Sequence, residues 1–234
     1  PCVATTAGAR LCRHAEDVGL LESVLRADLG ELLPDAAAPT LRLAVNADSL
    51  ATWFISAMAA TEGLLFDLVL DDQDHSADWL RKGEVSAAVT ANPAPVQGCG
   101  SRPLGALRYV ATASPEFIRR WLPDGLTPEA LARAPCLRFD AKDQLQSRWI
   151  EQTLRQPIAS PTHWLPSSQA FVDGALAGLG WGMNPEALVR DHLTAGRLIL
   201  LAPDTPLDVP LYWHWPRAIE AGLARVTSAV MTAA

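Results

Sequence analysis

A short polar segment after an apolar run is the part of this sequence best suited to binding a charged ligand. Apolar residues alternate over Leu41–Val45 as in a strand, and Asn46-Ala47-Asp48-Ser49 ends the alternation. Apolar residues return at helical spacing from Leu50, and Ser49 is of a type that caps helix N-termini. A helix start of this kind can bind a small anion through free N–H groups, and its carboxylate can pair with a cation.

A second polar helix start lies far along the chain. The segment Pro166-Ser167-Ser168-Gln169 precedes another predicted helix, and its two hydroxyls could bind an anion as Ser49 could. Each of these serines is equally well explained as an N-cap, and the two roles are compatible. Two half-sites in one chain predict a ligand cleft between two lobes.

Acidic side chains follow two further predicted strands. Asp72 lies in the segment Asp71–Asp74 after the strand 67–70, and Asp140 follows the strand 136–139. Either carboxylate could pair with an ammonium or guanidinium group, and a solvated turn is the alternative explanation for both. Lys142 adds a positive charge that could cancel the effect of Asp140.

The other motifs predict no chemistry. The glycine-rich segment Gly178–Gly182 lacks the spacing of a phosphate loop or a dinucleotide fingerprint, so we expect a tight turn there. The histidines are scattered, the cysteines have no metal-binding spacing, and no nucleophile–base pair is evident. We therefore expect no catalytic residue, no metal site and no cofactor.

The elements that position these residues alternate between strands and helices, which predicts an α/β fold with a parallel sheet. The expected strands are 41–45, 67–70, 85–90, 106–112, 136–139, 162–165, 181–184, 198–201 and 209–215. The expected helices are 49–60, 76–82 and 143–155, one that begins at the Ser167–Ser168 segment, one after each of Ser114-Pro115 and Thr127-Pro128, and a final one from about 217.

The first part of the chain predicts one long helix. It begins at Thr6, a good N-cap, and ends near Gly30. We expect it to pair with another chain, and packing on its own domain is the alternative. Its apolar residues recur every three or four positions, at Leu11, Ala15, Val18, Leu21, Leu25 and Leu29.

Composition narrows the function further. The chain has 234 residues, of which 49% are hydrophobic, so it can bury a real core. Its net charge of −7 argues against direct binding of nucleic acid by this part of the protein. No apolar run reaches membrane-spanning length and no signal peptide is recognisable, so we expect a cytoplasmic protein.

Four segments resemble a known family, the LysR-type transcriptional regulators, and within it the lysine- and arginine-responsive branch (the ArgP/LysG type). Two of them fit that branch in particular and lie in Ala44–Trp53 and Pro210–His214. The other two, Leu80–Val85 and Ser167–Val172, fit LysR-type regulators broadly. The resemblance covers essentially the whole chain.

The resemblance implies two Rossmann-like lobes, as in type 2 periplasmic binding proteins, preceded by a long dimerisation or linker helix. Residues 1–33 would be the end of the DNA-binding wing and the linker helix, and 34–39 a linker. Lobe I would comprise 40–110 and 206–234, and lobe II 111–205. The DNA-reading domain itself would be missing from this chain, through truncation or processing.

The family's site residues carry over at matching positions. In lobe I these are Asn46, Asp48, Ser49, Asp72 and Thr90. In lobe II they are Asp140, Ser167 and Ser168.

The expected function is sensing of a basic amino acid, lysine or arginine, to control genes of amino-acid export or metabolism. The expected partners are this effector, further copies of the chain in a homodimer or tetramer, promoter DNA through the N-terminal domain, and RNA polymerase. An amino-acid solute-binding protein of the same fold is the alternative, and an enzyme is a third. The helix 10–29 favours the regulator, since transport receptors have no use for a dimerising helix.

Overall fold

The structure is a computed structural model that describes residues 4–29, 38–70 and 76–234. The chain divides into unit 1, which is Pro1–Gly105 with Pro210–Ala234, and unit 2, which is Ala106–Val209. It passes from one unit to the other twice, within strands β4 (Cys99–Ala113) and β9 (Leu207–Pro216). Asp72, Gly30 and most of the expected linker 34–39 lie outside the described residues.

Unit 1 is built on a sheet whose first three strands are parallel. The central strand is β1 (Thr40–Val45), which pairs in parallel with β2 (Leu65–Leu70) on one side and with β3 (Ala87–Thr90) on the other. Strand β9 then pairs antiparallel with β3. Because β1, β2 and β3 run in the same direction, their C-terminal ends meet at one edge of the sheet.

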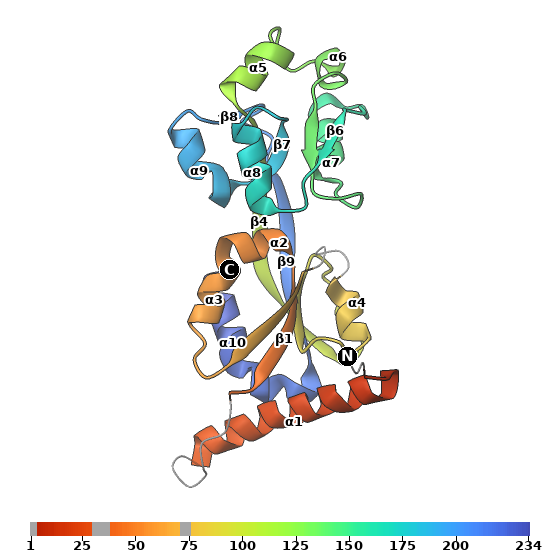
Figure 1. The fold of residues 1–234 in the computed structure, drawn as a ribbon, viewed down its shortest axis with the longest axis vertical. Helices are drawn as coiled ribbons and strands as arrows, with labels where there is room; N and C mark the ends of the chain where they lie inside the picture. The colour runs from red at the N-terminus through yellow and green to blue at the C-terminus, as the bar shows by residue number, and fades with distance from the viewer. Residues whose placement is uncertain (1–3, 30–37, 71–75) are drawn as a thin grey trace. The chain divides into compact units, whose positions relative to one another are not determined.

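Helices cover both faces of this sheet (Figure 1). One face is covered by α10 (Glu220–Ala233) and by a helical run of α2 (Ala47–Ser49), η2 (Leu50–Phe54) and α3 (Ile55–Ala59). On this face the indole of Trp213 lies 6.4 Å from the ring of Phe54 and donates to the Thr227 hydroxyl. The other face is covered by α4 (Ser76–Arg81), which packs Leu80 against Ala44 and Ala88.

The long first helix is present as α1 (Thr6–Leu29). Its first turn is capped by Thr5, whose hydroxyl accepts the Gly8 N–H at 3.1 Å, so the prediction of Thr6 as the cap was wrong. Leu20 is buried against Gly222 of α10, where an added Cβ would come within 2.8 Å of the Leu20 side chain. The helix therefore packs on its own unit, as the alternative interpretation expected, but through a residue outside the predicted stripe.

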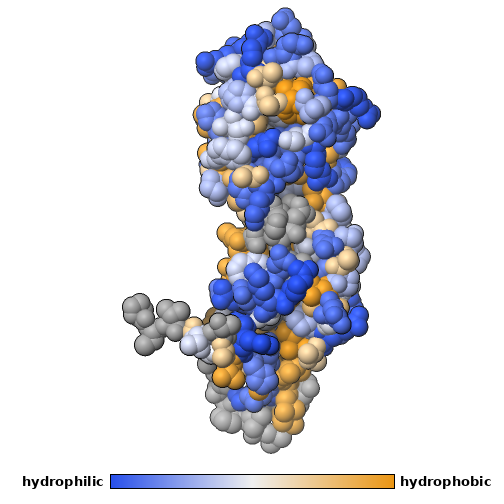
Figure 2. Space-filling view, turned by 90° about the vertical axis from the view of Figure 1, so that its right-hand side faces the viewer, coloured by the Kyte–Doolittle hydropathy of each residue, from blue (hydrophilic) through white to orange (hydrophobic). Residues whose placement is uncertain are grey.

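The predicted stripe itself is exposed on this chain. The Leu11 side chain is 70% exposed and Leu25 is 55% exposed, and the other large members are exposed as well: Val18, Leu21 and Leu29. Figure 2 shows apolar residues at the surface of the part of unit 1 that is drawn at the bottom. Exposed leucines repeated along one helix are typical of a surface that a partner covers.

In unit 2, the antiparallel strands that pair with β4 belong to the same sheet as β9, and a separate sheet has two parallel strands. Strand β4 pairs antiparallel with β7 (Gly182–Pro185) and β8 (Ile199–Leu200). Strand β5 (Cys136–Arg138) pairs in parallel with β6 (Thr162–Trp164), and a bridge from Cys136 to Trp181 connects β5 to the start of β7. The helices are α5 (Pro115–Trp121), α6 (Pro128–Leu131), α7 (Leu145–Leu154), α8 (Ser168–Leu176) and α9 (Glu186–Thr194).

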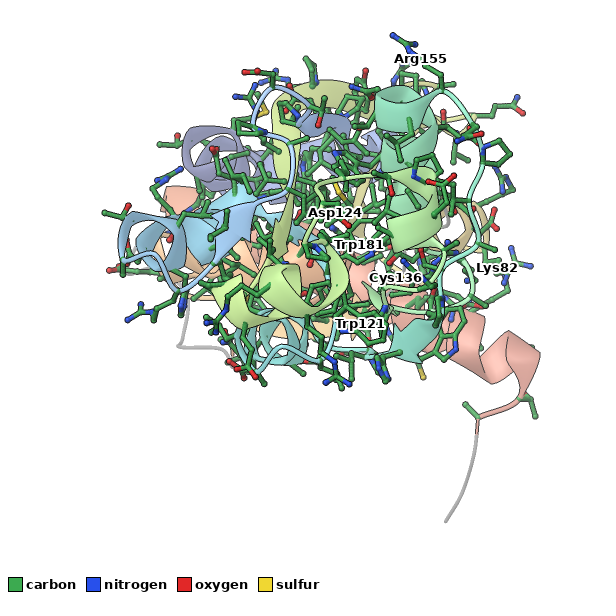
Figure 3. All side chains as sticks on the ribbon, turned by 90° about the horizontal axis from the view of Figure 1, so that it is seen from above. Lys82, Trp121, Asp124, Cys136, Arg155 and Trp181 are labelled. Atoms are coloured by element: carbon green, nitrogen blue, oxygen red, sulfur yellow. The ribbon has the colours of Figure 1, made fainter. Side chains whose placement is uncertain are left out.

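Aromatic packing fills the interior of unit 2. Trp149 of α7 and Trp181 are fully buried, and their ring centroids lie 5.1 Å apart. Figure 3 shows Trp181 beside Cys136 in the interior, and Arg155 at the periphery, where it ends α7 in the left-handed conformation. The predicted tight turn at Gly178–Gly182 is confirmed, since Gly178 has φ +73° and an added Cβ at Gly182 would meet the Phe171 ring at 2.3 Å.

The exposed stripe of α1 predicts that this chain self-associates. We expect the wild-type chain to be a dimer or larger at micromolar concentrations, and L11S/L25S to be largely monomeric. Each leucine buried in an interface contributes about 1.5–3 kcal/mol, so losing two should weaken association by at least about a hundredfold. Light scattering coupled to size-exclusion chromatography measures the mass directly.

The matched control is Glu16→Ser, an exposed change on the same helix that should leave the mass unaltered. A monomeric wild-type chain would contradict the prediction, as would an assembly that L11S/L25S leaves intact.

Candidate functional site

Two predicted site residues of unit 1 meet at the C-terminal edge of the parallel strands. The β1–β3 register pairs Ala44 with Ala88, so Asn46 and Thr90, each two residues further along the chain, lie at the same edge of the sheet. Both side chains are buried, Asn46 at 3% exposure and Thr90 at 0%. The Thr90 hydroxyl accepts the backbone N–H of Asn92 at 3.1 Å.

The helix that follows β1 begins earlier than expected. Asn46 is the last extended residue, with ψ 152°, and the helical run starts at Ala47. Ser49 is therefore the third helical residue, and the prediction of Ser49 as an N-cap was wrong. Its side chain is fully buried instead, and no described residue offers its hydroxyl a hydrogen-bond partner.

This helix is also not the regular one expected over 49–60. Residues Leu50–Phe54 form a π-helix between two α-helical pieces. The Thr52 hydroxyl donates to the Asp48 carbonyl at 2.7 Å and is 3.4 Å from that of Ser49, and such back-bonding competes with the regular helical ladder. Short π segments occur frequently at functional sites.

Unpartnered polar atoms mark this edge of unit 1. In the described part of the chain, neither Asn46 Oδ1 nor Ser49 Oγ has a hydrogen-bond partner, although both atoms are buried. Leaving a buried polar atom unpaired costs about 1–3 kcal/mol, so such atoms are uncommon in native structures and call for an explanation. Asp48 lies beside them in the first helical turn, where it is half-buried and already has an interaction within the chain.

Sequence reasoning missed two residues of β9 that lie on the same face of this sheet. The β3–β9 register pairs Thr90 with Tyr212 and Ala88 with His214, so both rings share a face with Thr90. Tyr212 is half-buried and its ring centroid lies 6.4 Å from that of His214. A histidine within an apolar strand was the signal that could have drawn attention to this position.

Burial disfavours protonation of His214. Its side chain is fully buried, and neither ring nitrogen has a partner among the described residues. Burial lowers the pKa of the imidazole below its usual value, because the charged form is poorly solvated there.

In unit 2, the predicted serines lie at the C-terminal ends of β5 and β6. The Leu165 N–H donates to the Arg138 carbonyl at 2.8 Å and holds the two strand ends together. Ser167 is the N-cap of α8, as predicted, and its hydroxyl accepts the Ala170 N–H at 3.3 Å. Ser168 is the first helical residue and is buried, so its prediction as an N-cap was wrong.

Asp140 serves a turn in this structure. Its Oδ1 accepts the backbone N–H groups of Lys142 at 2.8 Å and Asp143 at 3.1 Å. This is the turn that the sequence offered as the alternative explanation of Asp140. The same carboxylate oxygen is less available to a ligand ammonium group as a result.

Two further polar residues of unit 2 were missed. The Arg138 guanidinium donates to the Ser147 hydroxyl at 2.7 Å, while its Nε is buried without a partner in the described chain. Gln146 is fully buried, and both polar atoms of its amide also lack a partner there. A guanidinium group at a strand end can bind a carboxylate.

Both units carry polar groups beside a helix start. The described residues contain no group of three or more histidine, cysteine, aspartate or glutamate side chains that could hold a metal ion. Each unit instead presents hydroxyl, amide or charged groups beside a helix start, which is the chemistry that recognises a small zwitterion.

Comparison with known proteins assigns the family. Residues 34–225 match the model of the LysR substrate binding domain. The chain is 43% identical over 236 residues to the HTH-type transcriptional regulator LysG of Mycobacterium tuberculosis, covering all of this chain and 77% of that protein. This chain belongs to the LysR family.

Solved structures of LysR-family members share its fold. The crystal structure of ArgP from Mycobacterium tuberculosis matches with a TM-score of 0.86 at 42% identity, covering 100% of this chain and 79% of that one. Full-length LysG from Corynebacterium glutamicum with bound effector Arg matches with a TM-score of 0.79 at 35% identity, with the same coverage. The predicted fold class is confirmed: two α/β lobes related to type 2 periplasmic binding proteins, after a long helix.

Membership in the LysR family also decides the class of function. The relatives are transcriptional regulators and not enzymes, so the regulator interpretation is confirmed over the solute-binding protein and the enzyme. In the described residues no helix is both long and apolar enough to cross a membrane.

The buried, unpartnered His214 predicts how stability depends on pH. Below about pH 6.5 the unfolded chain takes up a proton on this imidazole, whereas the folded chain, with its lowered pKa, does so only at lower pH. Stability should therefore fall as the pH drops from 7 toward 5. H214L should flatten that fall and should leave stability at pH 7 unchanged or raised, because no hydrogen bond is lost.

Chemical unfolding of both chains across this pH range measures the effect. The difference in unfolding free energy between H214L and wild type should increase as the pH falls. Parallel curves would contradict the prediction, and a loss of several kcal/mol at pH 7 would show that the imidazole has partners.

Proposed function

We propose that this chain is the effector-sensing part of a LysR-type regulator that binds a basic amino acid, lysine or arginine. The observation that carries the proposal is the pair of buried, unpartnered atoms at the end of β1, Asn46 Oδ1 and Ser49 Oγ. The related LysG from Corynebacterium glutamicum with bound effector Arg supports the choice of ligand.

Unit 1 supplies partners for the positive charges of the effector in this proposal. The Asp48 carboxylate and the Asn46 amide oxygen accept hydrogen bonds from ammonium or guanidinium groups. Asp72 is a further candidate for the same role from the sequence, although it lies outside the described residues. Thr90 holds the end of β3, next to β1, because its hydroxyl accepts the Asn92 N–H.

Partners for the effector carboxylate come from hydroxyls and helix N-terminal amides. Ser49 is one, and the α8 start with Ser167 and Ser168 is another. We add Arg138 to the residues proposed from the sequence, because a guanidinium binds a carboxylate in two parallel hydrogen bonds. Asp140 becomes the weakest of the proposed residues, since its carboxylate already accepts two backbone N–H groups.

The wider setting follows the LysR-type pattern. We propose that the protein acts in the cytoplasm as a homodimer or tetramer, binds promoter DNA through an N-terminal domain and contacts RNA polymerase. Its effector would then control genes for export or metabolism of basic amino acids.

A basic amino acid should raise the melting temperature of this chain. A ligand present at 100 times its dissociation constant stabilises the folded state by about 2.7 kcal/mol. We expect lysine or arginine to produce a clear shift at millimolar concentration in differential scanning fluorimetry, and glutamate to produce none. A shift with an aromatic acid but with neither basic amino acid would show that the proposed effector class is wrong.

Asp48→Asn should affect effector binding more than folding. The substitution keeps the shape of the side chain and removes its charge. Loss of one partner of a desolvated charged pair costs about 2–5 kcal/mol, so affinity for lysine or arginine should fall by roughly 30-fold or more.

The rival explanation is that Asp48 only stabilises the helix dipole in the first turn of the helical run. Its loss would then cost about 0.3–1 kcal/mol of stability and leave affinity unchanged. Calorimetric titration of the variant, beside a thermal melt, separates the two. Glu62→Gln, an exposed change in the same unit that also replaces a carboxylate by an amide, is the matched control.

A further inference from the structure

We propose that Tyr212 and His214 form an aromatic shelf that selects the cationic side chain of the effector through a cation–π contact with Tyr212. The inference rests on the proposed function and names a specificity-determining residue for it. All of its evidence lies within unit 1.

The strand register places Tyr212 at the C-terminal edge of the parallel strands, where Asn46 and Thr90 lie. Tyr212 is paired with Thr90, and Asn46 directly follows the neighbouring strand β1. Register partners in a sheet point to the same face, so Thr90 and Tyr212 form a row at the edge where Asn46 precedes the helical run. Trp213 points to the opposite face, where it packs against Phe54 and binds Thr227.

Burial distinguishes the residues at this edge. Thr90 is fully buried and Asn46 nearly so, whereas Tyr212 is only half-buried. The buried Asn46 oxygen without a described partner indicates that a donor is missing from this edge of the sheet. A guanidinium or ammonium group supplies such donors and also binds the face of an aromatic ring.

Burial lowers the pKa of His214, which disfavours a positive charge beside Tyr212. His214 lies two residues beyond Tyr212 on the same face, with ring centroids 6.4 Å apart, and it is fully buried among apolar residues that include Ala88. A protonated imidazole at this distance would repel the effector's cation, whereas a neutral one does not.

Calorimetric titration of the full chain with arginine and with citrulline tests the proposal, because citrulline has the same shape without the charge. Y212L should weaken arginine binding by about 5- to 30-fold, the range of a cation–π contact, and should change citrulline binding much less. Y212F keeps the ring and should retain most of the preference for arginine. Trp121→Leu, an aromatic change on α5 whose ring contacts Phe117 and Arg120 of the same helix, is the matched control and should alter neither.

A second measurement does not depend on how the variants fold. The chain has two tyrosines, Tyr109 and Tyr212, and Tyr109 is buried. In the wild-type chain with labelled tyrosine rings, arginine should shift the Tyr212 resonances and leave those of Tyr109 nearly unchanged.

The outcomes separate the two proposals. If arginine binds but neither shifts the Tyr212 ring nor loses affinity in Y212L, the shelf is overturned and the proposed function stands. Equal losses for arginine and citrulline also overturn the shelf, since they reveal a structural role. If neither lysine nor arginine binds the wild-type chain, both proposals fail.

Discussion

Parallel pairing of β1 with its two neighbours is the constraint on which the rest of unit 1 depends. It brings the ends of β1 and β3 to one edge, so polar residues far apart in the sequence, Asn46 and Thr90, become neighbours. Antiparallel β9 then adds Tyr212 beside Thr90, because the pleat sends register partners to a common face. The binding chemistry proposed here is a consequence of strand direction and register.

Both units leave polar groups unpartnered in places where apolar residues would be more stable. Asn46, Ser49 and His214 in unit 1 and Gln146 in unit 2 are all buried with unpaired atoms in the described chain. Each such atom costs about 1–3 kcal/mol, which a purely structural sequence would avoid. The π-helix at Leu50–Phe54 lies in the same region as Ser49. Local irregularity and unmet hydrogen bonds together are typical of sites that are completed by a ligand.

The long helix α1 has one surface that packs on its own unit and another that stays exposed. Leu20 packs on α10 and ties the helix to unit 1, whereas the stripe that includes Leu11 and Leu25 stays exposed. The helix can therefore be part of its own unit and still offer a surface to another chain. For a LysR-family regulator, this places the proposed assembly surface and the proposed effector contacts of unit 1 on one small domain.

Apolar periodicity and N-cap residues predicted the order of the helices and strands, because both are local signals in the sequence. The strands at β1, β5 and β6, the caps Ser114, Thr127 and Ser167, and the Gly178 turn all follow from near neighbours. The short segments that resemble LysR-type regulators predicted the class of function, and they too are local signals in the sequence. Tertiary structure decided what depends on distant partners: that Ser49 is buried inside a helix rather than capping it, and that the Asp140 carboxylate closes a turn. Strand register also places Tyr212 and His214 on the face that carries Thr90, and burial leaves Arg138 and Gln146 with unpaired polar atoms in the described chain, which no local signal in the sequence indicates.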